Sequence, residues 1–147
     1  MRYLLVLLAL TFVGSLTASA QNQRVDNRYQ RDIDRKLAVM DYLMSDRGFS
    51  RSHDHTIDFL YEGQRDGYTL NLDAGRTYHF MATCDEDCND IDLRLYTYNG
   101  RLIQSNTRSD SLPIITFRPS YSGTYRIEAD MYSCSTEPCY YGIGIYR

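Results

Sequence analysis

Five acidic side chains lie within eight consecutive positions, and carboxylates at this density can bind a metal ion. They are Asp85, Glu86, Asp87, Asp90 and Asp92. Hard cations such as Ca²⁺ take about six to eight oxygen ligands, several of them charged. We therefore take Asp85, Asp87, Asp90 and Asp92 as candidate calcium ligands. The spacing does not match an EF-hand loop, and a solvated acidic loop is the alternative interpretation.

Four cysteines form two closely spaced pairs, which could either bind zinc or form disulfide bonds. They are Cys84, Cys88, Cys134 and Cys139, with gaps of three and four residues. These gaps are wider than the two-residue gaps typical of zinc sites. An exported chain meets an oxidising compartment, so we predict disulfides. Proximity along the chain favours Cys84–Cys88 and Cys134–Cys139, whereas the entropy of loop closure favours long-range pairing.

Motifs for catalysis are weak in this sequence. His53, Asp54 and His55 could contribute to a metal site, but transition metals need about three or four convergent ligands. We interpret these three residues as polar loop residues. The sequence contains no Ser-His-Asp elbow, zinc-protease helix motif or phosphate-binding loop. We therefore expect a protein that is not an enzyme.

Composition narrows the class of protein further. The 147 residues are 43% hydrophobic and 24% charged, which is ordinary for a globular domain and excludes disordered and collagen-like chains. Sixteen basic residues stand against 19 acidic ones, giving a net charge of −3. Proteins that bind nucleic acid normally carry a basic patch, so we expect no nucleic-acid partner.

Residues 1–20 have the pattern of a secretory signal peptide. Arg2 supplies the positive charge, residues 4–13 form an apolar run, and Ala18-Ser19-Ala20 offers small residues for cleavage. We predict cleavage after Ala20. The apolar run is too short to cross a bilayer, so we expect no membrane span in the mature chain. The expected location is the periplasm or the exterior of the cell.

Residues 21–50 form the next segment, and a helical period predicts one helix within it. Side chains spaced three or four positions apart make one apolar stripe: Tyr29, Ile33, Leu37, Met40 and Met44. Asp26 or Asn27 is the predicted N-cap, and Gly48 is the predicted C-terminal stop. We expect the stripe to pack on the following domain, and a partner-binding helix is the alternative.

From Thr56 onward the hydrophobic period changes to two, which is typical of strands. Eight short strands are predicted over residues 57–61, 68–72, 78–82, 91–95, 102–103, 115–117, 125–131 and 141–145. Glycine turns separate several of them, and Asn99-Gly100 is the clearest hairpin signal. Residues 51–147 are therefore predicted to form one all-β domain of two packed antiparallel sheets.

Three segments of this domain resemble the bacterial pre-peptidase C-terminal (PPC-like) domain. In order, they are Asp90–Ile103, Pro113–Pro119 and Ser122–Ile127, and Gly67–Gly75 is similar to the opening of that domain. The family is similar in fold to the collagen-binding domains of secreted collagenases, and some of its members bind calcium near the acidic cluster. The resemblance implies an eight-stranded antiparallel jelly-roll β-sandwich, preceded here by one N-terminal α-helix. The helix and both cysteine pairs depart from the family pattern.

A second resemblance concerns the run Ser122-Gly123-Thr124-Tyr125. It is similar to the loop with which periplasmic lysozyme inhibitors enter the lysozyme cleft. That resemblance implies that Ser122, Gly123 and Tyr125 carry inhibition. The alternative interpretation is structural, with Gly123 making a turn and Tyr125 filling the core.

The sequence as a whole predicts an exported, non-catalytic binding module that acts at the cell envelope or outside the cell. Its expected partner is an envelope or extracellular protein or polysaccharide, and bound calcium would stabilise the fold. Inhibition of a lysozyme is the alternative function. Fold transfers between relatives far better than function does, so the ligand needs evidence from the site itself.

Overall fold

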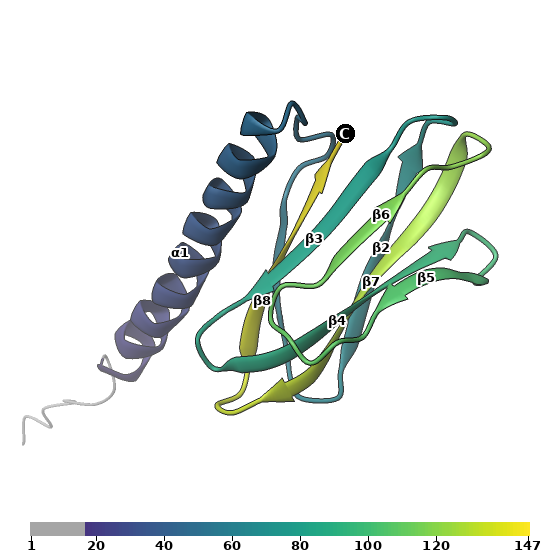
Figure 1. The fold of residues 1–147 in the computed structure, drawn as a ribbon. Coiled ribbons are helices and arrows are strands. Elements are labelled where there is room, and N and C mark those ends of the chain that lie inside the picture. The colour runs from purple at the N-terminus through teal and green to yellow at the C-terminus, as the bar shows by residue number, and fades with distance from the viewer. Residues whose placement is uncertain (1–16) are drawn as a thin grey trace, which may run out of the picture.

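The computed structural model describes the backbone of residues 17–147 and the side chains of residues 28–147. Residues 1–16, most of the predicted signal peptide, lie outside this description. One helix is followed by eight strands, and each of the eight segments predicted as strands overlaps one of them (Figure 1). The elements are α1 (Thr17–Asp46), β1 (Thr56–Leu60), β2 (Arg65–Leu72), β3 (Tyr78–Cys84), β4 (Cys88–Thr97), β5 (Leu102–Asn106), β6 (Ile114–Phe117), β7 (Gly123–Cys134) and β8 (Cys139–Tyr146).

The strands form two antiparallel sheets that pack face to face. The first sheet has the order β1-β8-β3-β6, and the second has the order β2-β7-β4-β5. Inward-facing side chains of both sheets make one core, in which Phe80, Ile91 and Ile127 are fully buried. The hydrophobic effect acting on this alternating pattern accounts for the two layers, because the strands bury apolar faces between them. Every residue of β8 is buried, because its other face packs against α1.

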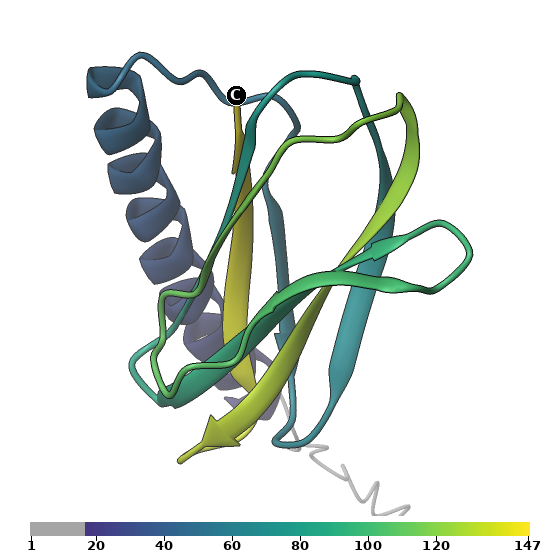
Figure 2. The same ribbon diagram turned by 45° about the vertical axis from the view of Figure 1, so that its right-hand side comes forward.

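Helix α1 covers the outer face of the first sheet (Figures 1 and 2). Its predicted apolar stripe is confirmed, since Ile33 and Leu37 are buried against Tyr140 and Tyr146 of β8. The chain leaves the helix as expected, with Gly48 in the left-handed region at a φ of 83°.

The predicted start of the helix is wrong. Asp26 and Asn27 lie inside α1, which begins at Thr17 and includes the predicted cleavage site. Residues 17–25 contain neither proline nor glycine and include good helix formers such as Ala20 and Gln21, so nothing stops the helix at the expected cap.

The outer face of the second sheet carries ion pairs in place of a covering helix. Arg94 on β4 donates to Asp92 at 3.0 Å and also to Asp130 on β7, which accepts a second contact from Arg65 at 2.8 Å. The side chains of Asp92 and Asp130 are only 5% exposed as a result. The period of two in the sequence did not predict that long arginine side chains would cover these carboxylates.

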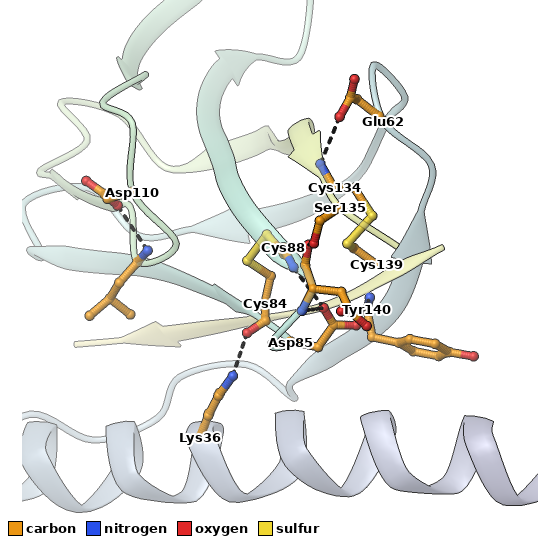
Figure 3. The surroundings of a disulfide bond; sticks show 12 residues. Lys36, Glu62, Cys84, Asp85, Cys88, Asp110, Cys134, Ser135, Cys139 and Tyr140 are labelled. Carbon is orange, nitrogen blue, oxygen red and sulfur yellow. Dashed lines mark hydrogen bonds between the residues drawn. A yellow bond between two sulfur atoms is a disulfide. The ribbon is translucent and has the colours of Figure 1, made fainter. Parts of the chain in front are cut away.

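Both disulfides form between cysteines close in sequence, and they lie near one another (Figure 3). The turns that they close are at the same end of the sandwich (Figure 1). Cys84–Cys88 closes the turn between β3 and β4, and Cys134–Cys139 closes the turn between β7 and β8. Their Cα atoms are 5.8 and 6.0 Å apart, within the range for unforced bridges. The local pairing that chain proximity favoured is the one present.

Candidate functional site

Asp85 lies beside the disulfides, and both oxygens of its carboxylate accept hydrogen bonds from backbone N–H groups (Figure 3). Its Oδ1 accepts hydrogen bonds from the N–H groups of Asp87 at 3.1 Å and Cys88 at 3.2 Å, and its Oδ2 accepts one from Tyr140 at 2.7 Å. Burial disfavours the charged form and raises the pKa of Asp85 to about 6, although these backbone donors oppose the shift. Asp85 therefore joins the β3–β4 turn to β8.

Two of the other predicted calcium ligands have partners, whereas the third, Asp90, has a buried Oδ1 atom with no hydrogen-bond partner in the described part of the chain. Asp87 accepts a hydrogen bond from the Tyr29 hydroxyl at 2.7 Å, Asp92 is held by Arg94, and Asp90 is buried on β4. Among residues 28–147, no three acidic, histidine or cysteine side chains are arranged to hold a metal ion. Calcium binding stays a prediction from the sequence, which a rise in melting temperature with millimolar calcium would test.

His53 and His55 face different partners. The Nε2 atom of His53 lies 3.2 Å from the carbonyl oxygen of Asn71, whereas that of His55 lies 3.0 Å from Oδ1 of Asp41 on α1. The two rings do not converge on one point. They connect the segment between α1 and β1 to its neighbours.

The run from Ser122 to Tyr125 makes several contacts within the fold. Tyr125 is 1% exposed and donates its hydroxyl hydrogen to the carbonyl oxygen of Tyr121 at 2.9 Å. The exposed Ser122 accepts a hydrogen bond from the N–H of Ala74 at 2.8 Å, which joins two neighbouring turns. Gly123 begins β7. Of the three residues predicted to carry inhibition, Ser122 is the one that solvent reaches most freely.

A small hollow lies beside this run, and sequence reasoning missed it. Its volume is about 300 Å³, and Tyr98 and Tyr121 stand among its lining residues. Both are exposed, by 76% and 52%. The hollow forms because the β4–β5 hairpin and the β6–β7 connection meet at this end of the sandwich.

The most distinctive surface is a row of four aromatic rings at the β1 edge of the first sheet. We call Tyr29, Tyr140, Phe59 and Tyr61 the aromatic row. Their ring centroids are separated in that order by 5.7, 5.6 and 6.4 Å, and the first two rings are nearly parallel, at 6°. Tyr140 is buried between its neighbours, while Phe59 and Tyr61 are 45% and 44% exposed.

Three elements assemble the aromatic row. Tyr29 comes from α1, Tyr140 from β8, and Phe59 from the edge strand β1, with Tyr61 directly after it. Residues two apart on a strand share a face, so Phe59 and Tyr61 point outward together, beyond the part of the sheet that α1 covers. The Phe59-x-Tyr61 spacing is the one sequence signal for the row. Tyr29 and Tyr140 are far from these residues in sequence and join the row only when the chain folds.

Carboxylates stand at both ends of the aromatic row. At one end the Tyr29 hydroxyl donates to Asp87, which raises the pKa of Tyr29, and the guanidinium of Arg28 lies 4.8 Å from the Tyr29 ring centroid. At the other end Glu62 accepts a hydrogen bond from the N–H of Cys134 at 3.0 Å. Glu137 accepts one from the N–H of Glu62 at 2.7 Å.

The surroundings of the row are rigid as well as acidic. Glu62 fixes the loop that carries Tyr61 to the Cys134–Cys139 bridge, and Lys36 Nζ donates to the Cys84 carbonyl at 2.7 Å (Figure 3). Both supports of the row, α1 and the β1–β2 loop, are thus tied to disulfide-closed turns. These contacts hold the elements that carry the row in place.

No protein-family model matches this chain. A search of curated proteins likewise found no significant match. Among the described residues, no helix is long and apolar enough to span a membrane. The aromatic row and its neighbours are therefore the features of this chain that bear on its function.

Proposed function

We propose that this protein is an exported, non-catalytic binding module whose ligand is a polysaccharide lying along the aromatic row. The observation that carries the proposal is the exposure of Phe59 and Tyr61 in continuous ring contact with Tyr140 and Tyr29. Large aromatic side chains left exposed next to one another are typical of binding surfaces.

The chemistry of sugars matches this surface. A pyranose ring presents a face of C–H groups, which packs on an aromatic ring, and an edge of hydroxyl groups, which donate hydrogen bonds. Phe59 and Tyr61 supply exposed ring faces, and Asp87, Glu62 and Glu137 supply acceptors at the two ends of the aromatic row. Because these acceptors are negatively charged, they favour neutral sugars and amino sugars and repel uronic or sulfated ones.

Other features support the export and the fold in this proposal. Two disulfides are typical of proteins that mature in oxidising compartments, in agreement with the signal-peptide pattern. The strand orders β1-β8-β3-β6 and β2-β7-β4-β5 support a jelly roll, as the resemblance to PPC-like domains implies. A binding role at the cell envelope or outside the cell follows from combining these features with the aromatic row.

Co-sedimentation with insoluble polysaccharides tests the proposal. We expect the purified protein to bind chitin or cellulose and to leave alginate, which is anionic, unbound. The double variant Phe59→Ala/Tyr61→Ala should bind at least about tenfold more weakly, because two ring faces are lost. It should keep its melting temperature, since both side chains are half exposed.

Tyr98→Ala is the matched control, because Tyr98 is 76% exposed and lies outside the aromatic row. It should bind as the wild type does. Failure to bind either neutral polysaccharide would contradict the proposal. Loss of binding in Tyr98→Ala but not in the double variant would instead assign the ligand to the hollow beside Tyr121.

A further inference from the structure

A second exposed surface lies on α1, on the side away from its buried stripe. Val39, Tyr42 and Leu43 are 57%, 71% and 44% exposed there. Arg35 and Asp46 flank them along the helix. We call Arg35, Val39, Tyr42 and Asp46 the outer stripe, because steps of four, three and four residues place them on one line of a helix.

The outer stripe borders a groove of about 720 Å³ between α1 and the first sheet. Leu43 on α1, Met81 on β3 and Leu112 before β6 are among its apolar lining residues. Leu112 is itself 47% exposed. The groove has room for a few inserted side chains, and its lining also includes charged residues such as Lys36 and Glu86. Exposed apolar side chains beside such a groove are typical of interaction surfaces.

The order of charges along the outer stripe is complementary to itself. Read from its N-terminal end, the stripe is basic, apolar, apolar and acidic. When two such helices lie antiparallel, each Arg35 faces an Asp46, and each Val39 faces a Tyr42. We infer that the outer stripe and its groove bind a second copy of this chain, in a two-fold symmetric dimer.

The ionic groups of the stripe are available for this contact. Arg35 is 74% exposed and lies 3.7 Å from Asp32, a loose pair within one helix turn. Asp46 is exposed, and no basic side chain among residues 28–147 comes within 4.0 Å of its carboxylate. Each dimer would contain two Arg35–Asp46 pairs, one at each end of the paired stripes.

The geometry leaves the aromatic row open. The groove lies on the β3 side of α1, whereas the row lies on the β1 side, and these strands are separated by β8 in the first sheet. The dimer therefore does not depend on the proposed function. Because exposed ion pairs contribute little free energy, we expect the dimer to be weak and concentration-dependent.

Sedimentation equilibrium of the purified protein, from micromolar to millimolar concentration, tests the inference. We expect a monomer–dimer equilibrium in the wild type. Arg35→Glu and Asp46→Arg each place like charges opposite one another at both ends of the interface. Each should raise the dimer Kd about tenfold, since exposed pairs contribute modestly and two are reversed at once.

The double variant Arg35→Glu/Asp46→Arg restores opposite charges and should return the Kd to within about threefold of the wild type. Arg101→Glu changes the net charge as Arg35→Glu does, but on the exposed β4–β5 turn, and should leave the Kd unchanged. Melting curves followed by circular dichroism confirm that each variant is folded. A wild type that stays monomeric throughout, or a double variant as weak as the single ones, would overturn the inference.

Discussion

Cys88 on β4 lies directly opposite Cys134 on β7 in the second sheet, yet each forms its disulfide with a cysteine only a few residues away. The two bridges therefore close separate turns rather than joining the strands. The cysteines are paired with their neighbours in sequence, although a long-range bridge would restrict the unfolded chain more strongly and so stabilise the fold more. The β3–β4 and β7–β8 turns lie side by side because their strands pair and because the N–H of Ser135 donates to the carbonyl oxygen of Asp87 at 2.8 Å. Both turns contact the elements that carry the aromatic row.

Removing one bridge should destabilise the protein without unfolding it. For Cys84→Ala/Cys88→Ala we expect a loss of about 2 kcal/mol in the free energy of unfolding, the value for closing a short loop. Urea denaturation measures it. Peptide mapping of the unreduced wild type should recover Cys84 joined to Cys88 and Cys134 joined to Cys139. A Cys88–Cys134 peptide would contradict the structure.

The stability of the protein should fall as pH rises through the pKa of Asp85. That pKa is raised from 3.8 to about 6, so the folded state holds the proton more tightly than the unfolded state does. The stabilisation is complete below about pH 4 and is lost as pH rises through about 6. Lys36, which lowers the pKa, and Asp87, which raises it, are the charged groups that face this carboxylate.

Asp85→Asn isolates this contribution. The amide does not titrate, so the difference in melting temperature between wild type and variant should change between pH 4 and pH 7. At neutral pH the variant should be less stable by about 1–3 kcal/mol, because an amide cannot accept hydrogen bonds on both sides. A difference that stays constant across this range would show that Asp85 does not titrate there.

Arg94 should contribute more to stability than any exposed arginine. Arg94→Ala leaves Asp92 without its cation and Asp130 with Arg65 alone, on a surface where both carboxylates are nearly buried. We expect a loss of about 3 kcal/mol in urea denaturation. Arg65→Ala is the control, with an expected loss below about 1 kcal/mol, because Asp130 keeps Arg94. Equal losses would contradict this division of roles.

Local patterns in the sequence predicted the elements of this fold, and long-range contacts account for what they missed. A period of two located all the strands, and the Ile33–Leu37 stripe located the buried side of α1. The aromatic row could not be predicted, because Tyr29, Phe59 and Tyr140 meet only after α1 packs on the first sheet. The partners of the acidic cluster could not be predicted either, since the N–H of Tyr140 on β8 reaches Asp85 and Arg94 reaches Asp92 only in the folded chain.

Variants of Tyr125 and Ser122 should distinguish a structural role of the run from Ser122 to Tyr125 from an inhibitory role. Tyr125→Phe removes the hydrogen bond to the Tyr121 carbonyl and should cost about 1 kcal/mol of stability. In Ser122→Ala the N–H of Ala74 loses its hydrogen-bond acceptor. Ala74 is exposed, so water can accept this hydrogen bond instead, and the loss in the free energy of unfolding should stay below about 0.5 kcal/mol.

Lysis of bacterial cell walls by lysozyme, measured with these two variants, tests the inhibitor hypothesis. Buried Tyr125 cannot enter a lysozyme cleft, so Tyr125→Phe should leave any inhibition by the wild type unchanged. Exposed Ser122 can donate a hydrogen bond to a cleft carboxylate, so Ser122→Ala should weaken inhibition if this loop is responsible. Inhibition that depends on Tyr125 but not on Ser122 would contradict the geometry of the turn. Absence of inhibition at micromolar protein would leave the run from Ser122 to Tyr125 with its structural role alone.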